Sequence, residues 1–162
     1  MRLRQTHTVQ LDNMHLPIEE WIDQYPFNEE CCFLCLCSLD NKNRTKEHIV
    51  PAWVQDRFDL NDQQLTLPNE TSIPYRQTVI PCCKVCNTGR LAQLESEVSA
   101  AVVGGYDKFS ELPDRKVYQW LQCLHFKFQF LGLRLPKDRR DPKGVTITDR
   151  DNLEQLRLSH FF

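Results

Sequence analysis

Two Cys-x-x-Cys pairs constrain this chain more than any other feature of its 162 residues. Cys32 and Cys35 form the first pair, and Cys83 and Cys86 form the second, 48 residues further on (83 minus 35). Each such turn holds its sulfurs one ligand spacing apart, and two turns supply the four thiolates of a closed tetrahedral zinc site. A site of this type contributes on the order of 10 kcal/mol to folding. The pairs therefore predict a structural Zn²⁺ ion that staples the intervening loop.

The chain has eight cysteines, so this choice of ligands has alternatives. Cys31 and Cys37 flank the first pair and Cys82 precedes the second, but only the chosen four keep the two-residue spacing in both turns. Cys123 lies at helical spacing between Trp120 and Lys127 and is expected to be a small buried side chain. The competing interpretation is a thioredoxin-like redox motif, which needs one such pair at a helix start rather than two.

Length and charge set the broad class. A chain of this size predicts one domain with a core of its own. It carries 20 basic and 22 acidic residues, a net charge of −2, which argues against a broad non-specific nucleic-acid coat but allows a local basic patch. The polar opening predicts no secretory signal peptide, and the apolar stretches are too short to cross a membrane. We therefore expect a cytoplasmic protein, in which paired cysteines bind metal more readily than they form disulfides.

Hydrophobic periodicity and turn residues predict a mixed α+β chain. The longest helical pattern is an apolar stripe in the last third of the chain. The expected elements are a strand over residues 1–11, a short helix around 18–24, a helix from Pro51 through Phe58, a loop over 59–76, a strand over 78–81, a helix from Arg90 to Gly104, a helix from Asp114 to Leu131 and a strand over 145–148.

The stretch between and around the cysteine pairs carries a further motif. Glu47 and His48 are followed by Ile-Val-Pro, and Asn87 directly follows Cys86, the second cysteine of the second pair. In this order the residues resemble the zinc-containing branch of the HNH (His-Asn-His) endonucleases, over about residues 31–95. The match covers the middle of the chain and leaves the two ends unexplained.

The resemblance implies a fold and a division of the chain. The fold is α+β, with a ββα-metal core and structural zinc knuckles, extended here by C-terminal helices. The division is an N-terminal extension (1–30), a zinc-stapled nuclease core (31–103) and a helical extension packed on that core (104–162).

The resemblance also implies a role for each matched residue. His48 is expected to be the general base that takes a proton from the attacking water. Glu47 and Asn87 are expected to bind one divalent ion, Mg²⁺ or Mn²⁺, and Arg90 to contact a phosphate. The alternatives are an ordinary structural histidine, a solvated carboxylate, an asparagine that caps the following helix and a solvated arginine.

One position departs from the family pattern. Thr78 stands where the family has its middle Asn, whose role is to orient the histidine through a backbone contact. A Thr hydroxyl has less reach, so we expect the orientation to be held in another way. Asn69 is a candidate substitute if its loop folds back toward His48.

The function implied is a metal-dependent endonuclease that hydrolyses nucleic-acid phosphodiester bonds, DNA being the expected substrate. An imidazole can accept a proton near neutral pH, and a hard cation stabilises the charge on the leaving oxygen. Small bacterial and phage proteins of this family often serve in genome defence or mobility beside a partner ATPase or DNA-recognition subunit, and the modest charge fits such dependence. The alternative is a non-catalytic zinc-stapled module that binds nucleic acid or protein, which the loss of the middle Asn favours.

Overall fold

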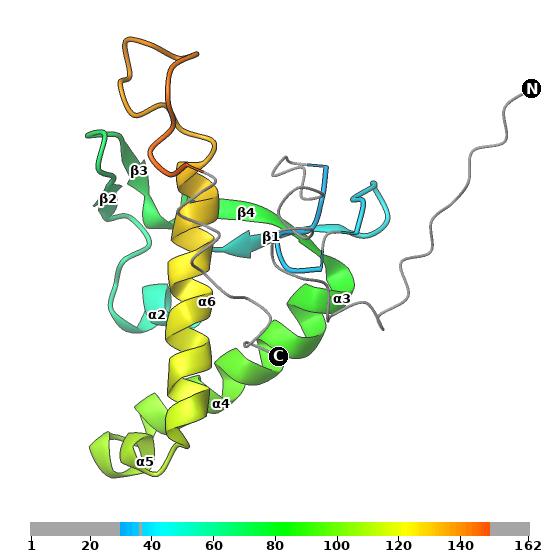
Figure 1. The fold of residues 1–162 in the computed structure, drawn as a ribbon. Coiled ribbons are helices and arrows are strands. Elements are labelled where there is room, and N and C mark those ends of the chain that lie inside the picture. The colour runs from blue at the N-terminus through cyan, green and yellow to red at the C-terminus, as the bar shows by residue number, and fades with distance from the viewer. Residues whose placement is uncertain (1–29, 36, 150–162) are drawn as a thin grey trace, which may run out of the picture.

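The computed structural model describes residues 30–35 and 37–149, and the strand expected over 1–11 and the helix expected around 18–24 lie outside them. The described part is a mixture of helices and small antiparallel sheets, which confirms the α+β prediction (Figure 1). Its elements are β1 (Arg44–His48), α2 (Ala52–Arg57), β2 (Gln64–Thr66), β3 (Ser72–Pro74), η2 (Tyr75–Gln77), β4 (Val79–Cys83), α3 (Lys84–Cys86), η3 (Asn87–Leu91), α4 (Ala92–Val103), α5 (Tyr106–Ser110) and α6 (Asp114–Gly132).

The central ribbon pairs β1 with β4 in antiparallel register, from Arg44 opposite Cys83 to His48 opposite Val79. A polar turn precedes β1. In this turn the Asp40 carboxylate accepts hydrogen bonds from the backbone N–H groups of Lys42 and Asn43. Asp favours such turns because its short side chain can replace a backbone acceptor. The ribbon therefore begins at a turn that its own sequence specifies.

A nearly unbroken helical run follows β4 directly. It passes from α3 through η3, a single π-helical turn, into α4. Gly104 ends the run as predicted, and Gly105 takes a left-handed backbone with φ 89°, which a residue without a side chain adopts at little cost. The short helix α5, which the sequence did not predict, then reverses the chain into α6.

Helix α6 covers the ribbon and completes the core. Phe126 and Phe130 on α6 contact Phe33 from the cysteine-rich turn, with ring centroids 6.1 and 6.3 Å apart. All three rings are buried, as is Cys123, which confirms the expectation for that cysteine. Figure 1 shows α6 crossing the ribbon. Helices α4 and α6 lie close together near α5 and diverge from each other above it. In the described part of the chain, no helix is both long and apolar enough to span a membrane.

The prediction of a loop over residues 59–76 is wrong. Two three-residue strands, β2 and β3, pair antiparallel there, with Leu65 opposite Ile73. Strands this short do not show a periodicity that a sequence pattern can detect. The turn between them includes Glu70 with φ 64°, and the side-chain oxygen Oδ1 of Asn69 accepts from the backbone N–H of Thr71.

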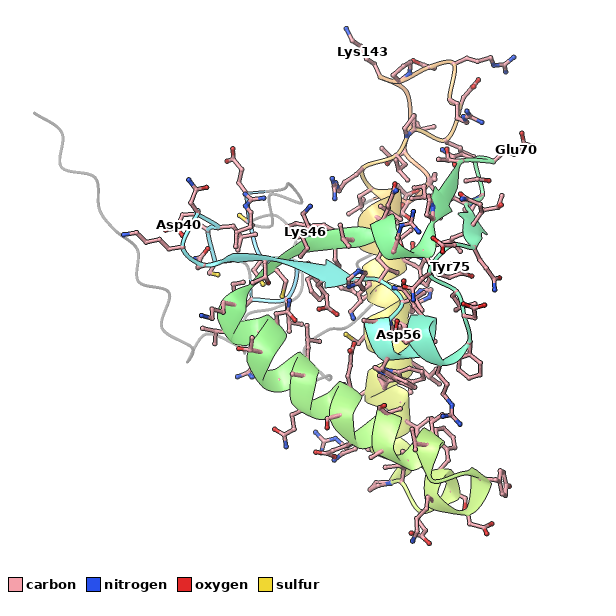
Figure 2. All side chains as sticks on the ribbon, turned by 180° about the vertical axis from the view of Figure 1, so that it is seen from behind. Asp40, Lys46, Asp56, Glu70, Tyr75 and Lys143 are labelled. Atoms are coloured by element: carbon pink, nitrogen blue, oxygen red, sulfur yellow. The ribbon has the colours of Figure 1, made fainter. Side chains whose placement is uncertain are left out.

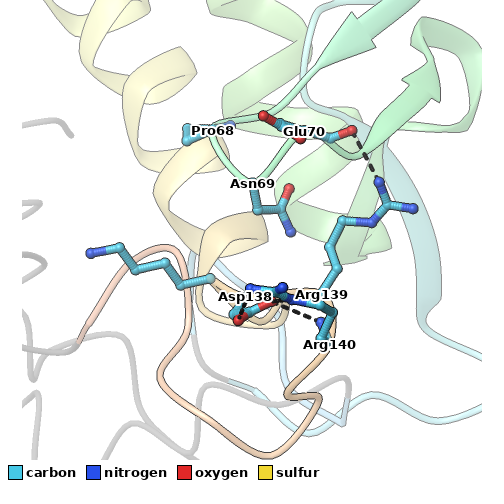
Figure 3. Close-up of a pocket in the computed structure, with 7 residues that line it drawn as sticks. Pro68, Asn69, Glu70, Asp138, Arg139 and Arg140 are labelled. Carbon is cyan, nitrogen blue, oxygen red and sulfur yellow. Dashed lines mark hydrogen bonds and ion pairs between the residues drawn. The ribbon is translucent and has the colours of Figure 1, made fainter.

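The turn of this hairpin contacts the loop that follows α6. The Asn69 amide donates to the carbonyl of Pro136 at 2.8 Å, and Arg139 reaches the carbonyl of Glu70 (Figure 3). The strand expected over 145–148 is reduced to a single bridge between Thr146 and Pro136. The hairpin is thus attached to the C-terminal end of α6.

We predict that Phe126→Ala lowers the free energy of unfolding by about 3–5 kcal/mol, because it removes a fully buried ring and leaves a cavity. Phe58→Ala is the matched control, since that ring is 56% exposed and its removal is expected to cost less than about 1 kcal/mol. Chemical denaturation followed by circular dichroism measures both values. Equal losses in the two variants would contradict a core centred on α6.

Candidate functional site

Four cysteine sulfurs converge where the cysteine-rich turn meets the end of β4. The sulfurs of Cys32, Cys35, Cys83 and Cys86 all lie within 4.8 Å of one another, and those of Cys35 and Cys83 are 3.7 Å apart. A tetrahedral site with metal–sulfur bonds of about 2.3 Å has sulfur–sulfur edges of about 3.8 Å. The four residues that the spacing selected are therefore placed to hold one metal ion. Figure 2 shows sulfur atoms gathered at the ribbon end near Asp40.

The backbone holds both cysteine turns in place. In the second turn the backbone N–H of Cys86 donates to the sulfur of Cys83 at 3.4 Å, a contact that stabilises negative charge on that sulfur. In the first turn the N–H of Cys32 donates to the carbonyl of Cys37 at 2.9 Å. The N–H of Phe33 donates to the carbonyl of Pro81 at 3.2 Å, which ties the first turn to the edge of β4. The two turns are thus fixed relative to one another.

Crowding of the sulfurs changes their acidity. Side-chain hydrogen-bond contacts with Cys35, Cys82 and Cys86 hold the pKa of Cys32 far below its ordinary value. The same contact with Cys32 raises the pKa of Cys35 to about 11 and also raises the pKa of Cys86. Negative charges this close repel one another, so the four thiols resist ionising together. A divalent cation would draw off their protons and replace the hydrogen bonds with metal–sulfur bonds.

The remaining nearby cysteines lie at the margin of this group. The sulfur of Cys82 is 3.9 Å from that of Cys32, and its thiol contacts the carbonyl of Cys83 at 3.5 Å. Cys31 and Cys37 are half-buried in the first turn. Among the described residues, the one group of His, Cys, Asp and Glu side chains close enough to hold a metal ion consists of the four chosen cysteines.

Glu47 and His48 form the far end of β1. Successive side chains of a strand point to opposite faces, so the two residues face different sides of the ribbon. Glu47 is buried and forms an ion pair with the ammonium group of Lys127 on α6, while His48 is half-buried. The carboxylate that the resemblance assigns to a divalent ion therefore has the ammonium group of Lys127 as its partner in this structure.

Asn87 lies inside the helical run, at the junction where α3 ends and η3 begins, and its backbone is helical with φ −64° and ψ −49°. It is not the N-cap of the helix that follows, since that position belongs to Cys86. Its side-chain amide donates to the hydroxyl of Thr45 at 3.0 Å and to the carbonyl of Lys46 at 3.2 Å. These contacts hold η3 against β1. The residue after the last cysteine thus lies beside the strand that ends in Glu47 and His48.

Thr78 and Asn69 do not contact the His48 side chain in the way that a middle Asn would. The buried Thr78 hydroxyl donates to the carbonyl of Tyr75 at 2.6 Å. Asn69 is bound to Pro136, so its loop does not fold back toward the ribbon. Arg90 is exposed on η3. The catalytic role of His48 and the metal and phosphate contacts of Glu47, Asn87 and Arg90 stay predictions.

Sequence reasoning missed Lys127 and its second partner, Glu95 on α4. The ammonium nitrogen lies 3.1 Å from a Glu95 oxygen and 3.2 Å from the carbonyl of His48. Burial alone lowers the pKa of Lys127, but the charges of Cys123, Glu95 and Glu47 outweigh burial and raise it. A detectable signal existed: a lysine stands in the apolar stripe of α6, four residues from Cys123.

Comparisons with protein-family models, with curated proteins and with solved structures find no match for this chain. The functional assignment therefore rests on the residues themselves and on their geometry. Their most definite feature is the four-sulfur group, followed by Glu47 and His48 at the opposite end of the ribbon.

We predict that the purified protein carries one metal ion per chain and that Cys83→Ser loses it, because a tetrahedral thiolate site with three sulfurs is incomplete. Cys82→Ser is the matched control: it changes the adjacent buried cysteine but keeps the four sulfurs. Elemental analysis against protein concentration measures the stoichiometry. Loss of the ion from Cys82→Ser, with retention in Cys83→Ser, would show that the ligand set is wrong.

Proposed function

We propose that this chain is a zinc-stapled endonuclease of the HNH type that hydrolyses phosphodiester bonds in nucleic acid, with DNA as the substrate. The observation that carries the proposal is the contact of Asn87 with β1. This contact sets Asn87, the residue after Cys86, beside the strand that ends in Glu47 and His48. The HNH pattern requires this association. The antiparallel ribbon followed directly by a helical run supports the same proposal.

In this proposal the four cysteines hold Zn²⁺ for structure alone. Four thiolates fill a tetrahedral site and leave no open position for water, whereas catalytic zinc sites keep one. The ion joins residues 32–35 to residues 83–86 and so fixes the ribbon and the start of the helical run. Its contribution is to hold the strand end in register.

His48 is the residue we assign to the chemistry, as the general base that takes a proton from the attacking water. It lies half-buried at the end of β1, and strand alternation sets it on the same face as Arg44 and Lys46, which are both exposed. Basic side chains on this face suit a phosphate backbone. Because Glu47 is held by Lys127, we assign no step to a divalent ion at that carboxylate.

The net charge of −2 supports the further proposal that the chain works beside a DNA-recognition subunit or an ATPase. A protein that grips DNA alone usually presents a much larger positive field. Genome defence or mobility is the setting we propose on the resemblance.

A second candidate, a non-catalytic zinc-stapled module that binds nucleic acid, is favoured by one specific observation. The acidic residue of the motif is buried against Lys127, away from any substrate. A module of this kind would bind nucleic acid through Arg44 and Lys46. His48 would take part in neither binding nor hydrolysis.

We predict that the protein nicks supercoiled plasmid and that His48→Ala lowers the rate by at least about 100-fold, the usual contribution of a general base. His125→Ala is the matched control, because that histidine is exposed on α6 and belongs to no part of the proposed site. Gel assays should compare Mg²⁺, Mn²⁺ and a chelator that spares the bound zinc. Nicking that survives His48→Ala would remove this residue from the mechanism, and DNA binding without nicking would favour the binding module.

We also predict that removing the zinc with a strong chelator lowers the melting temperature by more than about 10 °C, since metal binding and folding are coupled in such sites. The transition should return when Zn²⁺ is added back. Circular dichroism on heating measures the change. An unchanged transition in protein shown to be free of metal would contradict a structural role for the ion.

A further inference from the structure

Lys127 makes more contacts than a structural lysine at a helix surface normally makes. Its side chain is 1% exposed, and its ammonium group meets three acceptors that come from two elements, β1 and α4. These are a carboxylate oxygen of Glu47 on β1, a carboxylate oxygen of Glu95 on α4 and the main-chain carbonyl of His48. An ammonium group has three N–H donors, so the three acceptors satisfy it completely.

The charges of this group require a cation. Two carboxylates lie against one ammonium, and the Glu47 side chain is 9% exposed and that of Glu95 20% exposed. Burying a carboxylate away from water costs several kcal/mol unless a positive charge lies beside it. The geometry points to Lys127 as the resident cation of this site, which binds Glu47, Glu95 and the His48 carbonyl in place of a divalent metal ion.

The surroundings keep the ammonium group where it is. Lys127 extends from the buried face of α6, between Phe126, Phe130 and Cys123. Withdrawing its charged end would drag it through the core, where a bare ammonium is strongly disfavoured. A divalent ion bound to the same Glu47 oxygen would bring two cations within a few ångströms, and they would repel. The lysine and the ion therefore exclude one another.

The same contact orients the main chain at His48. The carbonyl of His48 accepts from Lys127, and the N–H of the same peptide group, which belongs to Ile49, donates to the carbonyl of Thr78 at 3.0 Å. Both polar groups of this peptide are thus held. Lys127 is a positioning residue that fixes the backbone after His48, the task that the absent middle Asn would otherwise perform. This inference does not depend on whether the protein cuts nucleic acid.

The test measures cation binding and stability rather than activity. In the zinc-loaded protein we expect Mn²⁺ to leave the melting temperature of the wild type unchanged. The melting temperature of Glu47→Gln should likewise not respond to Mn²⁺. Lys127→Met should lower the melting temperature by roughly 10 °C, because it strips two buried carboxylates of their partner. Mn²⁺ should then restore part of the loss, and the double variant Lys127→Met with Glu47→Gln should show no restoration.

Lys116→Met is the matched control, since Lys116 pairs with Glu97 on α4 at a half-exposed position. It should shift the melting temperature by no more than about 2 °C and should show no response to Mn²⁺. Binding of Mn²⁺ to the wild type that Glu47→Gln abolishes would overturn the inference. A loss in Lys127→Met no larger than in Lys116→Met, or a loss that Mn²⁺ does not restore, would also overturn it.

If Lys127→Met fails to fold, the wild type still decides the question. A buried, fully bonded ammonium group exchanges slowly enough for its nitrogen resonance to be followed by NMR. We expect that resonance to stay unchanged in excess Mg²⁺. A Mg²⁺-dependent shift or loss of the signal, absent in Glu47→Gln, would show that the ion displaces Lys127.

Discussion

Convergence of four sulfurs within 4.8 Å is the constraint on which the central part of this protein depends. Without a cation, thiols packed this closely cannot ionise together, because their negative charges would repel. A metal ion removes that conflict and joins two turns that are far apart in the sequence. The second of these turns follows directly on β4, the strand that pairs with β1, which ends in His48.

A second electrostatic contact joins the C-terminal helix to the same ribbon. Lys127 connects α6 to Glu47 at the end of β1 and to Glu95 on α4. Phe126 and Phe130 pack on Phe33 beside it, so α6 contributes to one core with the cysteine-rich turn. Residues of α6, which lies beyond the second cysteine pair, thus complete the environment of Glu47.

The two parts of the site differed in how far the sequence could predict them. The metal-ligating cysteines were recognisable because two-residue spacing is a local property of a turn, and α6 because its apolar stripe repeats over five turns. The hairpin β2–β3 was not, because three-residue strands carry no periodicity. Lys127, the partner of Glu47, could not be predicted either, because an ion pair between residues 80 positions apart leaves no local pattern in the sequence.

The sequence by itself determined which four cysteines could hold a metal ion, the mixed α+β class and the place of the longest helix, because each follows from spacing within one segment. Only the tertiary structure decided what surrounds Glu47. Whether a carboxylate meets water, a metal ion or an ammonium group depends on which distant helix packs against it. Here α6 brings a lysine, so the electrostatics of the strand end are set by packing between segments that the sequence keeps apart.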